Sequence, residues 1–206
     1  MNNMDEALLR AFPLLAASVS GMQQAAAEFG TRYVVGRHGV SREVTLPWIR
    51  VCQLIAPSVL TLPYGVVPDA VEFRCGPIPG EVLRAFVADA KQAQPLEIAG
   101  VFLWNEAGDS WRYARREART ASGSHIEYDE VRAGDGEHIV VDVHSHGLHA
   151  AFFSAEDDAD DAGAMKVSLV LGNLDWERPT SKMRLCMAGT MQPAYLNGDG
   201  RLGVTL

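Results

Sequence analysis

Residues 137–161 read EHIVVDVHSHGLHAAFFSAEDDADD, and this stretch decides the fold of the second half of the chain. Its first part, 137–144, is rich in β-branched residues and predicts a β-strand. Its last part starts at Ser154, a residue type that caps helix N-termini, and continues with acidic residues that favour a first helical turn. The stretch therefore predicts a strand, a short loop and a helix over 154–164.

Two histidines stand two positions apart where this strand ends. Successive strand side chains point to opposite faces, so His144 and His146 point the same way and can share one zinc ion. A hydrolytic zinc site takes three protein ligands and keeps one position open for water. Asp157 is a reasonable third ligand, because the first turn of the helix can fold back over the strand end. Such a site carries a charge of roughly +1, which lowers the pKa of a bound water towards about 7.

Each part of this pattern also has a plainer interpretation. Histidines close in sequence are often surface residues, and Ser-x-x-Asp is an ordinary helix start. The acidic residues from Glu156 to Asp161 are also typical of a solvated helix face. His149 breaks the two-residue strand spacing, so we interpret it as a loop residue rather than a ligand. The combination of these parts favours a metal site more than any part does alone.

The segments around this stretch predict a mixed arrangement of helices and strands. A helix is expected over 81–92, where apolar residues fall on one side, and it ends before Pro95. Further strands are predicted over 98–104, 111–118, 124–131, 167–171 and 183–188. A helix ahead of several strands and a second helix among them indicate an α+β or α/β sandwich, with a mixed sheet flanked by helices.

The first 79 residues are expected to form a small α/β N-terminal region. Apolar residues between Leu8 and Phe29 recur every three or four positions and predict a helix that kinks or begins at Pro13. We interpret this stripe as packing within its own domain, with a dimer or partner seam as the alternative. Glycine and proline then punctuate short β-rich runs. The segment 76–80, GPIPG, predicts the boundary between domains 1–79 and 80–206.

The composition excludes several classes of protein. The net charge of −8, with only short basic runs, argues against a nucleic-acid binder. No apolar run approaches the roughly 20 residues of a membrane span, and the N-terminal stretch lacks the positive start of a secretion signal. The three cysteines form no CxxC pair, which excludes a cysteine-based zinc knuckle and suggests a reducing compartment. We therefore expect a soluble, cytoplasmic protein that binds neither nucleic acid nor membrane.

The run His144-Ser145-His146, seven residues, then Ser154-Ala155-Glu156-Asp157 resembles the metal motif of the JAB/MPN family, also called the JAMM metalloproteases. That family also uses a glutamate well upstream, and Leu96-Glu97-Ile98-Ala99-Gly100-Val101-Phe102 resembles the segment that carries it. The resemblance covers about residues 80 to 192. It implies a JAB/MPN fold of the cytidine-deaminase-like type.

The resemblance also implies roles for five residues. His144, His146 and Asp157 would bind Zn²⁺. Glu97 would take a proton from the attacking water and donate it to the leaving amine, and Ser154 would hydrogen-bond the oxyanion. The residues alone do not select Glu97 over Glu106. The resemblance selects Glu97, and it implies a metallopeptidase or isopeptidase.

The N-terminal extension and the run 146–154 are similar to a narrower bacterial group, the A protein of PRTRC-type cassettes. Such cassettes pair a JAB-like protein with a ThiF-like activating enzyme of the E1 kind and small ubiquitin-like proteins. The implied substrate is the C-terminal peptide or isopeptide bond of a ubiquitin-like partner. Two alternatives stay open: a non-catalytic MPN-type scaffold, and a zinc hydrolase of a small amide such as a cysteine conjugate. The sequence leaves the oligomeric state open.

Overall fold

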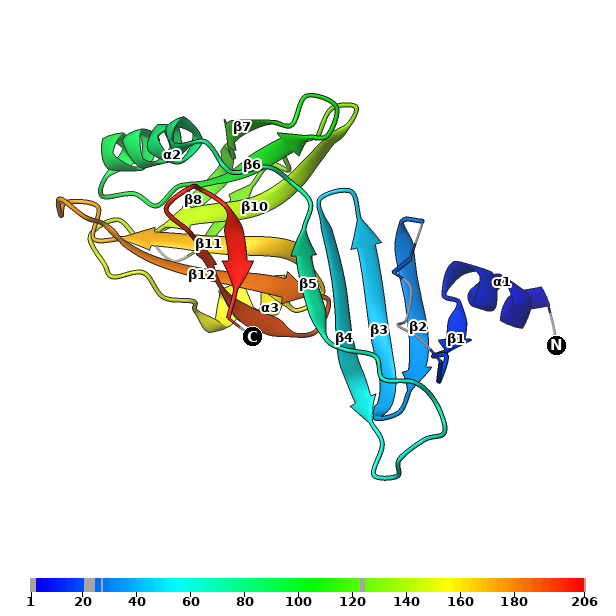
Figure 1. Ribbon diagram of the computed structural model, residues 1–206. Helices are drawn as coiled ribbons and strands as arrows, with labels where there is room; N and C mark the ends of the chain where they lie inside the picture. Colours follow the sequence, from blue (N-terminus) through cyan, green and yellow to red (C-terminus); the bar gives the residue numbers. More distant parts are fainter. Residues whose placement is uncertain (1–2, 21–24, 27, 123–124, 206) are drawn as a thin grey trace. The chain divides into compact units, whose positions relative to one another are not determined.

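The computed structural model of the chain describes residues 3–20, 25–26, 28–122 and 125–205, without the side chains of 118–128. The chain divides into two compact units, residues 1–74 and 75–206, which are drawn in Figure 1. The Gly- and Pro-rich segment 76–80 begins one residue after the start of the second unit.

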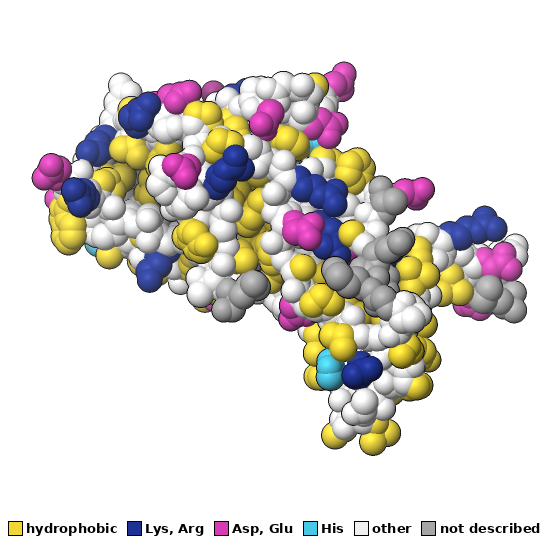
Figure 2. Space-filling model, viewed as in Figure 1, with side chains coloured by type: hydrophobic (Ala, Val, Ile, Leu, Met, Phe, Trp, Pro, Cys, Tyr) yellow, Lys and Arg dark blue, Asp and Glu magenta, His cyan; other side chains and the backbone are white. Residues whose placement is uncertain are grey.

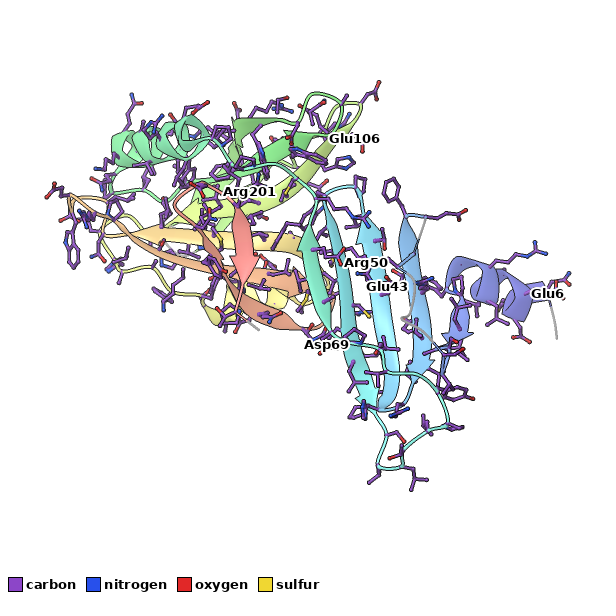
Figure 3. The ribbon with its side chains drawn as sticks, in the orientation of Figure 1. Glu6, Glu43, Arg50, Asp69, Glu106 and Arg201 are labelled. Atoms are coloured by element: carbon purple, nitrogen blue, oxygen red, sulfur yellow. The ribbon has the colours of Figure 1, made fainter. Side chains whose placement is uncertain are left out.

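The first unit is built around one five-stranded sheet in the order β1-β2-β3-β4-β5. Its elements are α1 (Asn3–Ala11), β1 (Leu14–Ala16), β2 (Gly30–Gly36), β3 (Gly39–Leu46), β4 (Ile49–Pro57) and β5 (Ala70–Phe73). The strand β1 pairs in parallel with β2, and the other pairs are antiparallel. Glu43 of β3 is almost fully buried and is neutralised by Arg32 of β2 and Arg50 of β4. Figure 3 shows Glu43 and Arg50 on neighbouring strands.

The long helix predicted between Leu8 and Phe29 is wrong. The helix α1 ends at Ala11, and the chain after Pro13 forms β1. Proline lacks an N–H, and its ring clashes with the preceding helical turn, so it ends the helix here. Backbone pairing continues past β1, because the N–H of Ala17 donates to the carbonyl of Val35 over 2.9 Å. Residues 21–24 and 27 of the predicted helix lie outside the described residues.

The second unit holds a seven-stranded mixed sheet in the order β14-β13-β12-β11-β10-β6-β7. Its elements are α2 (Gly80–Ala93), β6 (Ala99–Asn105), β7 (Ser110–Arg115), β8 (Ala118–Ser122), β9 (His125–Tyr128), β10 (Glu137–Ser145), α3 (Ala155–Asp161), β11 (Met165–Gly172), β12 (Thr180–Met187), β13 (Met191–Leu196) and β14 (Leu202–Val204). The strands β8 and β9 form a separate two-stranded antiparallel sheet. The mixed sheet with its helices confirms the predicted α+β class.

Most predicted elements of this unit are confirmed, with shifted ends. The helix over 81–92 is α2, and the strands over 98–104, 137–144, 167–171 and 183–188 are β6, β10, β11 and β12. The strand predicted over 111–118 ends at Arg115, and β8 starts separately at Ala118. The strand predicted over 124–131 appears as the shorter β9, with residue 124 outside the described residues. The strands β13 and β14 were not predicted.

One face of the seven-stranded sheet is apolar and carries the core. The strand registers place four fully buried side chains in one row across it: Phe102, Val141, Val167 and Leu185. The helix α2 covers this face, because Phe86 packs edge-on against the rings of Phe102 and Tyr113. This face accounts for the burial of the middle of the sheet.

The other face of the sheet carries a row of polar side chains, beside buried valines such as Val101 and Val170. The next row along the strands consists of Asp142, Ser168 and Arg184, and strand alternation directs these side chains away from α2. His144, two residues after Asp142, lies on the same face. The helix α3 lies against this side, where Asp161 accepts a 2.9 Å hydrogen bond from Arg184. Figure 1 shows α2 and α3 on opposite sides of the sheet. The sheet therefore separates the part of the core under α2 from the histidines.

The surface agrees with the composition. In the face drawn in Figure 2, acidic and basic side chains are interspersed and form no continuous basic patch. Within the described residues, every helix is too short or too polar to cross a membrane.

Candidate metal centre

The end of β10 brings the two histidines together. His144 is half-buried near the end of the strand, and His146 is buried directly after it. Between them Ser145 points into the protein and is fully buried. The Nε2 atoms of His144 and His146 lie 3.1 Å apart. The two side chains thus point to the same side, as the two-residue spacing predicted, and their Nε2 atoms are close enough to bind one ion.

Asp157 completes a group of three possible ligands. Its Oδ1 lies 3.4 Å from Nε2 of His144, and one ligand atom from each of the three residues lies within 4.8 Å of the others. Zn–N and Zn–O bonds of about 2.0–2.2 Å in a tetrahedral site separate two ligand atoms by roughly 3.3 Å. The observed distances of 3.1 and 3.4 Å match this separation. Two imidazoles and one carboxylate are also a donor set of zinc hydrolases.

The N-terminus of α3 holds the Asp157 side chain in place. Ser154 is the N-cap, and Asp157 stands at the third helical position. The Oδ2 atom of Asp157 accepts from the backbone N–H of Ser154 at 2.7 Å and from its hydroxyl at 2.6 Å. The N–H of Asp157 in turn donates to Ser154 Oγ at 3.2 Å. With Oδ2 engaged in the cap, Oδ1 is the oxygen directed at His144.

The electrostatic environment favours a neutral imidazole at His144. Burial lowers the pKa of His144 below its usual value, and the nearby His146 lowers it further, while Asp157, Asp142 and Glu97 raise it less. Without a metal, a contact between His144 and Asp157 would gain most from a protonated imidazole, which this environment disfavours. A neutral imidazole instead offers the lone pair that a metal requires.

The register of β6 against β10 distinguishes the two candidate glutamates. Ala99 is paired with His144, whereas Asn105 is paired with Glu137 at the far end of β10. Glu97, exposed just before β6, therefore lies at the histidine end of the sheet. Glu106 lies at the opposite end, 3.6 Å from His138, and is labelled in Figure 3.

Ser145 connects the Glu97 segment to the histidines. Its Oγ accepts a 3.1 Å hydrogen bond from the N–H of Ile98, and its own N–H donates to the carbonyl of Ile98 at 2.9 Å. Both bonds are formed by the residue next to Glu97. The serine between the two histidines thereby fixes the position of the chain that carries the glutamate.

The loop 147–153 between β10 and α3 is held at several points. The N–H of Ala151 donates to Oγ1 of Thr180, and the N–H of Asn173 donates to the carbonyl of His149. Gly172 lets this loop approach, because a β-carbon there would lie 2.2 Å from the carbonyl oxygen of His149. The His149 side chain is exposed, and the residue stands outside the three-residue metal group.

Several contacts of the site were missed by sequence reasoning. Phe152 packs edge-on against the ring of His146, with centroids 4.4 Å apart. Arg184, in β12, forms ion pairs with Asp158 and Asp161 of α3. These pairs join residues 23 and 26 positions apart. The acidic run in 156–161 was the sequence signal for these ion pairs, because any carboxylate of the run that is buried requires a cationic partner.

A comparison with family models matches residues 79–186 to the prokaryotic homologs of the JAB domain. The chain belongs to this prokaryotic JAB family. The matched range contains β6, β10, α3 and β11, and with them all five residues of the resembling motif. The prediction of a JAB/MPN fold over the second half of the chain is confirmed.

Outside the JAB domain, residues 2–74 match a second family, described as a domain of unknown function, DUF2016. Among solved structures, the JAB protein is similar to the solution structure of protein DSY2949 from Desulfitobacterium hafniense. That match has 19% sequence identity and a TM-score of 0.42, and it covers 62% of this chain and 88% of the other. The comparison with curated proteins finds no match.

Proposed function

We propose that this JAB protein is a zinc-dependent hydrolase that cleaves a peptide or isopeptide bond at the C-terminus of a ubiquitin-like protein. The observation that carries the proposal is the convergence of His144, His146 and Asp157 at separations that suit tetrahedral zinc. Membership of the JAB family, which includes isopeptidases and non-catalytic modules, supports the same reading.

Zinc bound by these three residues would supply the Lewis acidity that activates water and polarises the scissile carbonyl. Glu97 is the proposed proton carrier. It stands exposed at the histidine end of β6, and its charge acts on the pKa of His144. Its carboxylate accepts a proton from the attacking water and then donates it to the leaving amine. A side chain open to solvent suits this role, because the substrate must reach it.

Ser154 is the proposed donor to the substrate oxyanion. Its hydroxyl donates to Asp157 Oδ2, and its backbone N–H donates to the same oxygen. When the hydroxyl turns to a substrate oxygen, Asp157 keeps the backbone donor and stays in place. One residue can therefore hold the ligand and stabilise developing negative charge.

The surroundings of the site support an extended peptide as substrate. Three exposed apolar residues stand within two positions of site residues in the chain: Leu96 near Glu97, Leu148 near His146 and Phe152 near Ser154. Phe152 also packs on His146 itself. Exposed apolar side chains around a polar centre are typical of a site that binds another chain.

The choice of a ubiquitin-like substrate rests on the resemblance to PRTRC-type A proteins. The match of residues 2–74 to a separate domain family fits the N-terminal extension of that group. In this proposal a ThiF-like, E1-type activating enzyme acts in the same pathway, on the C-terminus that this hydrolase releases.

The test is a cleavage assay of the full chain, loaded with zinc, against ubiquitin-like proteins that carry C-terminal fusions. We expect cleavage by the wild type and loss of cleavage in His144→Ala, because one of three ligands is removed. Glu97→Gln should abolish cleavage and retain zinc, since the amide cannot carry the proton. Glu106→Gln is the matched control, and it should cleave like the wild type.

Three outcomes would contradict the proposal in different ways. Cleavage by Glu97→Gln at the wild-type rate would contradict the mechanism. Full zinc occupancy without turnover would instead favour a non-catalytic scaffold. Turnover of small amides, such as cysteine conjugates, but of no protein fusion would favour the small-amide alternative.

A further inference from the structure

The helix α3 carries the metal ligand Asp157 but has no apolar anchor. Its seven residues are AEDDADD, and among them only Asp161 is buried. A surface helix is usually held on its domain by an apolar stripe. Because α3 lacks one, its position depends on polar contacts.

Arg184 of β12 makes most of these contacts. Its Nε donates to Asp161 Oδ2 at 2.9 Å, and its Nη2 lies 2.7 Å from the same oxygen. Its Nη1 donates to Oδ1 of Asp158. The guanidinium carbon lies 3.8 Å from the ring centroid of Phe153, the residue before the N-cap. One arginine thus contacts the chain before the helix and two residues in it.

A second cation joins α3 to the histidine strand. Lys166 of β11 lies 2.7 Å from Oδ1 of Asp161 and 2.9 Å from Oδ2 of Asp142. Asp142 stands two residues before His144 on the same face of β10, and Arg116 also pairs with it at 3.0 Å. The contacts run from the strand of one metal ligand to the helix of another.

Asp161, Arg184 and Lys166 stabilise one another's charges. Burial raises the pKa of Asp161, but hydrogen bonds from Lys166, Ser168 and Arg184 outweigh it and hold the pKa below its usual value. Asp161 is therefore a buried carboxylate with two cationic partners, one on each oxygen. The planar fork of Arg184 binds two carboxylates at once, a geometry that a lysine cannot reproduce.

We propose that Arg184 is a positioning residue that sets the metal affinity of the site by fixing α3, and with it Asp157, against the histidines. The inference rests on the proposed zinc centre. Asp157 and Asp161 are one helical turn apart, so a shift of α3 at Asp161 moves the Oδ1 of Asp157 relative to His144. The predicted effect is on binding of the metal, before any step of catalysis.

The test measures the affinity of the full chain for zinc by competition with a chromophoric chelator, together with the visible spectrum of the cobalt form. Arg184→Ala should weaken the affinity by about 10- to 100-fold, the usual effect of removing a group that orients a metal ligand. Arg184→Lys should recover part of the loss, because it restores one charge without the fork. The cobalt spectrum of Arg184→Ala should change, which a stability effect alone would not produce.

Arg112→Ala is the matched control. Arg112 also forms a two-bonded ion pair in the same unit, with Glu137, which lies at the opposite end of β10 from His144. Its zinc affinity should equal that of the wild type. Equal zinc affinities of Arg184→Ala and the wild type would overturn the inference.

If Arg184→Ala fails to fold, Asp158→Ala decides the question. Asp158 is the exposed partner of Arg184, so its removal loosens the contact without leaving a charge buried. A weakened zinc affinity in this folded variant supports the inference, and an unchanged affinity overturns it. A wild-type chain that does not bind zinc overturns the proposed function itself, which separates the two failures.

Discussion

The helices α2 and α3 of the JAB domain are attached to one sheet in opposite ways. The helix α2 buries Val82, Phe86 and Ala90 against the apolar face. The helix α3 buries only Asp161 and is held by Arg184 and Lys166. Apolar burial is non-directional and supplies stability. A forked ion pair contributes less stability and specifies direction and distance. The helix that carries the candidate ligand Asp157 is the one held by directional contacts.

The largest effect expected from this comparison is on stability, at α2. Phe86 is fully buried and contacts the rings of Phe102 and Tyr113. Phe86→Ala should lower the free energy of unfolding by about 3–5 kcal/mol, because it removes apolar burial and leaves a cavity. Urea unfolding of the full chain measures this change. The folded fraction should keep the zinc affinity of the wild type. A parallel loss of zinc affinity would contradict the view that α2 supplies stability and α3 positions Asp157.

A smaller effect is expected at the cap of α3. Ser154→Ala removes one of two donors to Asp157 Oδ2 and the acceptor for the Asp157 N–H. The loss of the cap should cost about 1 kcal/mol of stability, and zinc affinity should fall with it. Ser154→Thr keeps the hydroxyl and should behave like the wild type in both measurements. A Ser154→Ala variant with unchanged affinity would show that the backbone donor alone holds Asp157.

The smallest effect is expected at an exposed ion pair away from both helices. The hydrogen bonds from Arg112 lower the pKa of Glu137 to about 2, with help from the N–H of Gly134. Arg112 is nearly half exposed, so the pair should contribute only about 0.2–1 kcal/mol at neutral pH.

The dependence of this contribution on pH follows from the lowered pKa. Glu137 titrates at a lower pH in the folded than in the unfolded chain, so its stabilisation is present above about pH 4.5 and is lost as the pH falls towards 2. The difference in unfolding free energy between the wild type and Arg112→Ala should shrink over this range. A difference that stayed constant down to pH 2 would contradict the assigned pairing.

The sequence predicted the site well where the geometry is local. The two-residue spacing of His144 and His146 and the Ser-x-x-Asp cap each fix side chains within a few residues. Strand alternation and capping geometry hold in any fold, so both features could be placed without knowing the rest of the protein. Which of Glu97 and Glu106 lies at the histidine end of the sheet followed only from the strand register, which pairs residues 32 to 45 positions apart along the chain.

The sequence predicted poorly where distant partners decide the outcome. The apolar stripe of 8–29 has helical spacing, but Leu14 and Leu15 pair with β2 instead. Asp161 fits a solvated acidic face by its neighbours, and it is buried only because Lys166 and Arg184 lie on the strands beside it. The exposed Asp158 and Asp160 match the plainer interpretation, so one helix contains both cases.

Ser145 links the histidines to a segment that contributes none of the three candidate ligands. The candidate zinc ligands come from the end of β10 and from α3, whereas Glu97 belongs to the segment ahead of β6, which Ser145 joins to the histidines through Ile98. In the proposed hydrolase, metal binding and catalysis would then depend on different segments of the chain. If the proposed function holds, a single exchange at the exposed Glu97 would leave the three candidate ligands in place and convert the proposed hydrolase into a protein that binds the same substrate without cleaving it. Evolution within such a family could therefore exchange catalysis for binding alone without any change in the core.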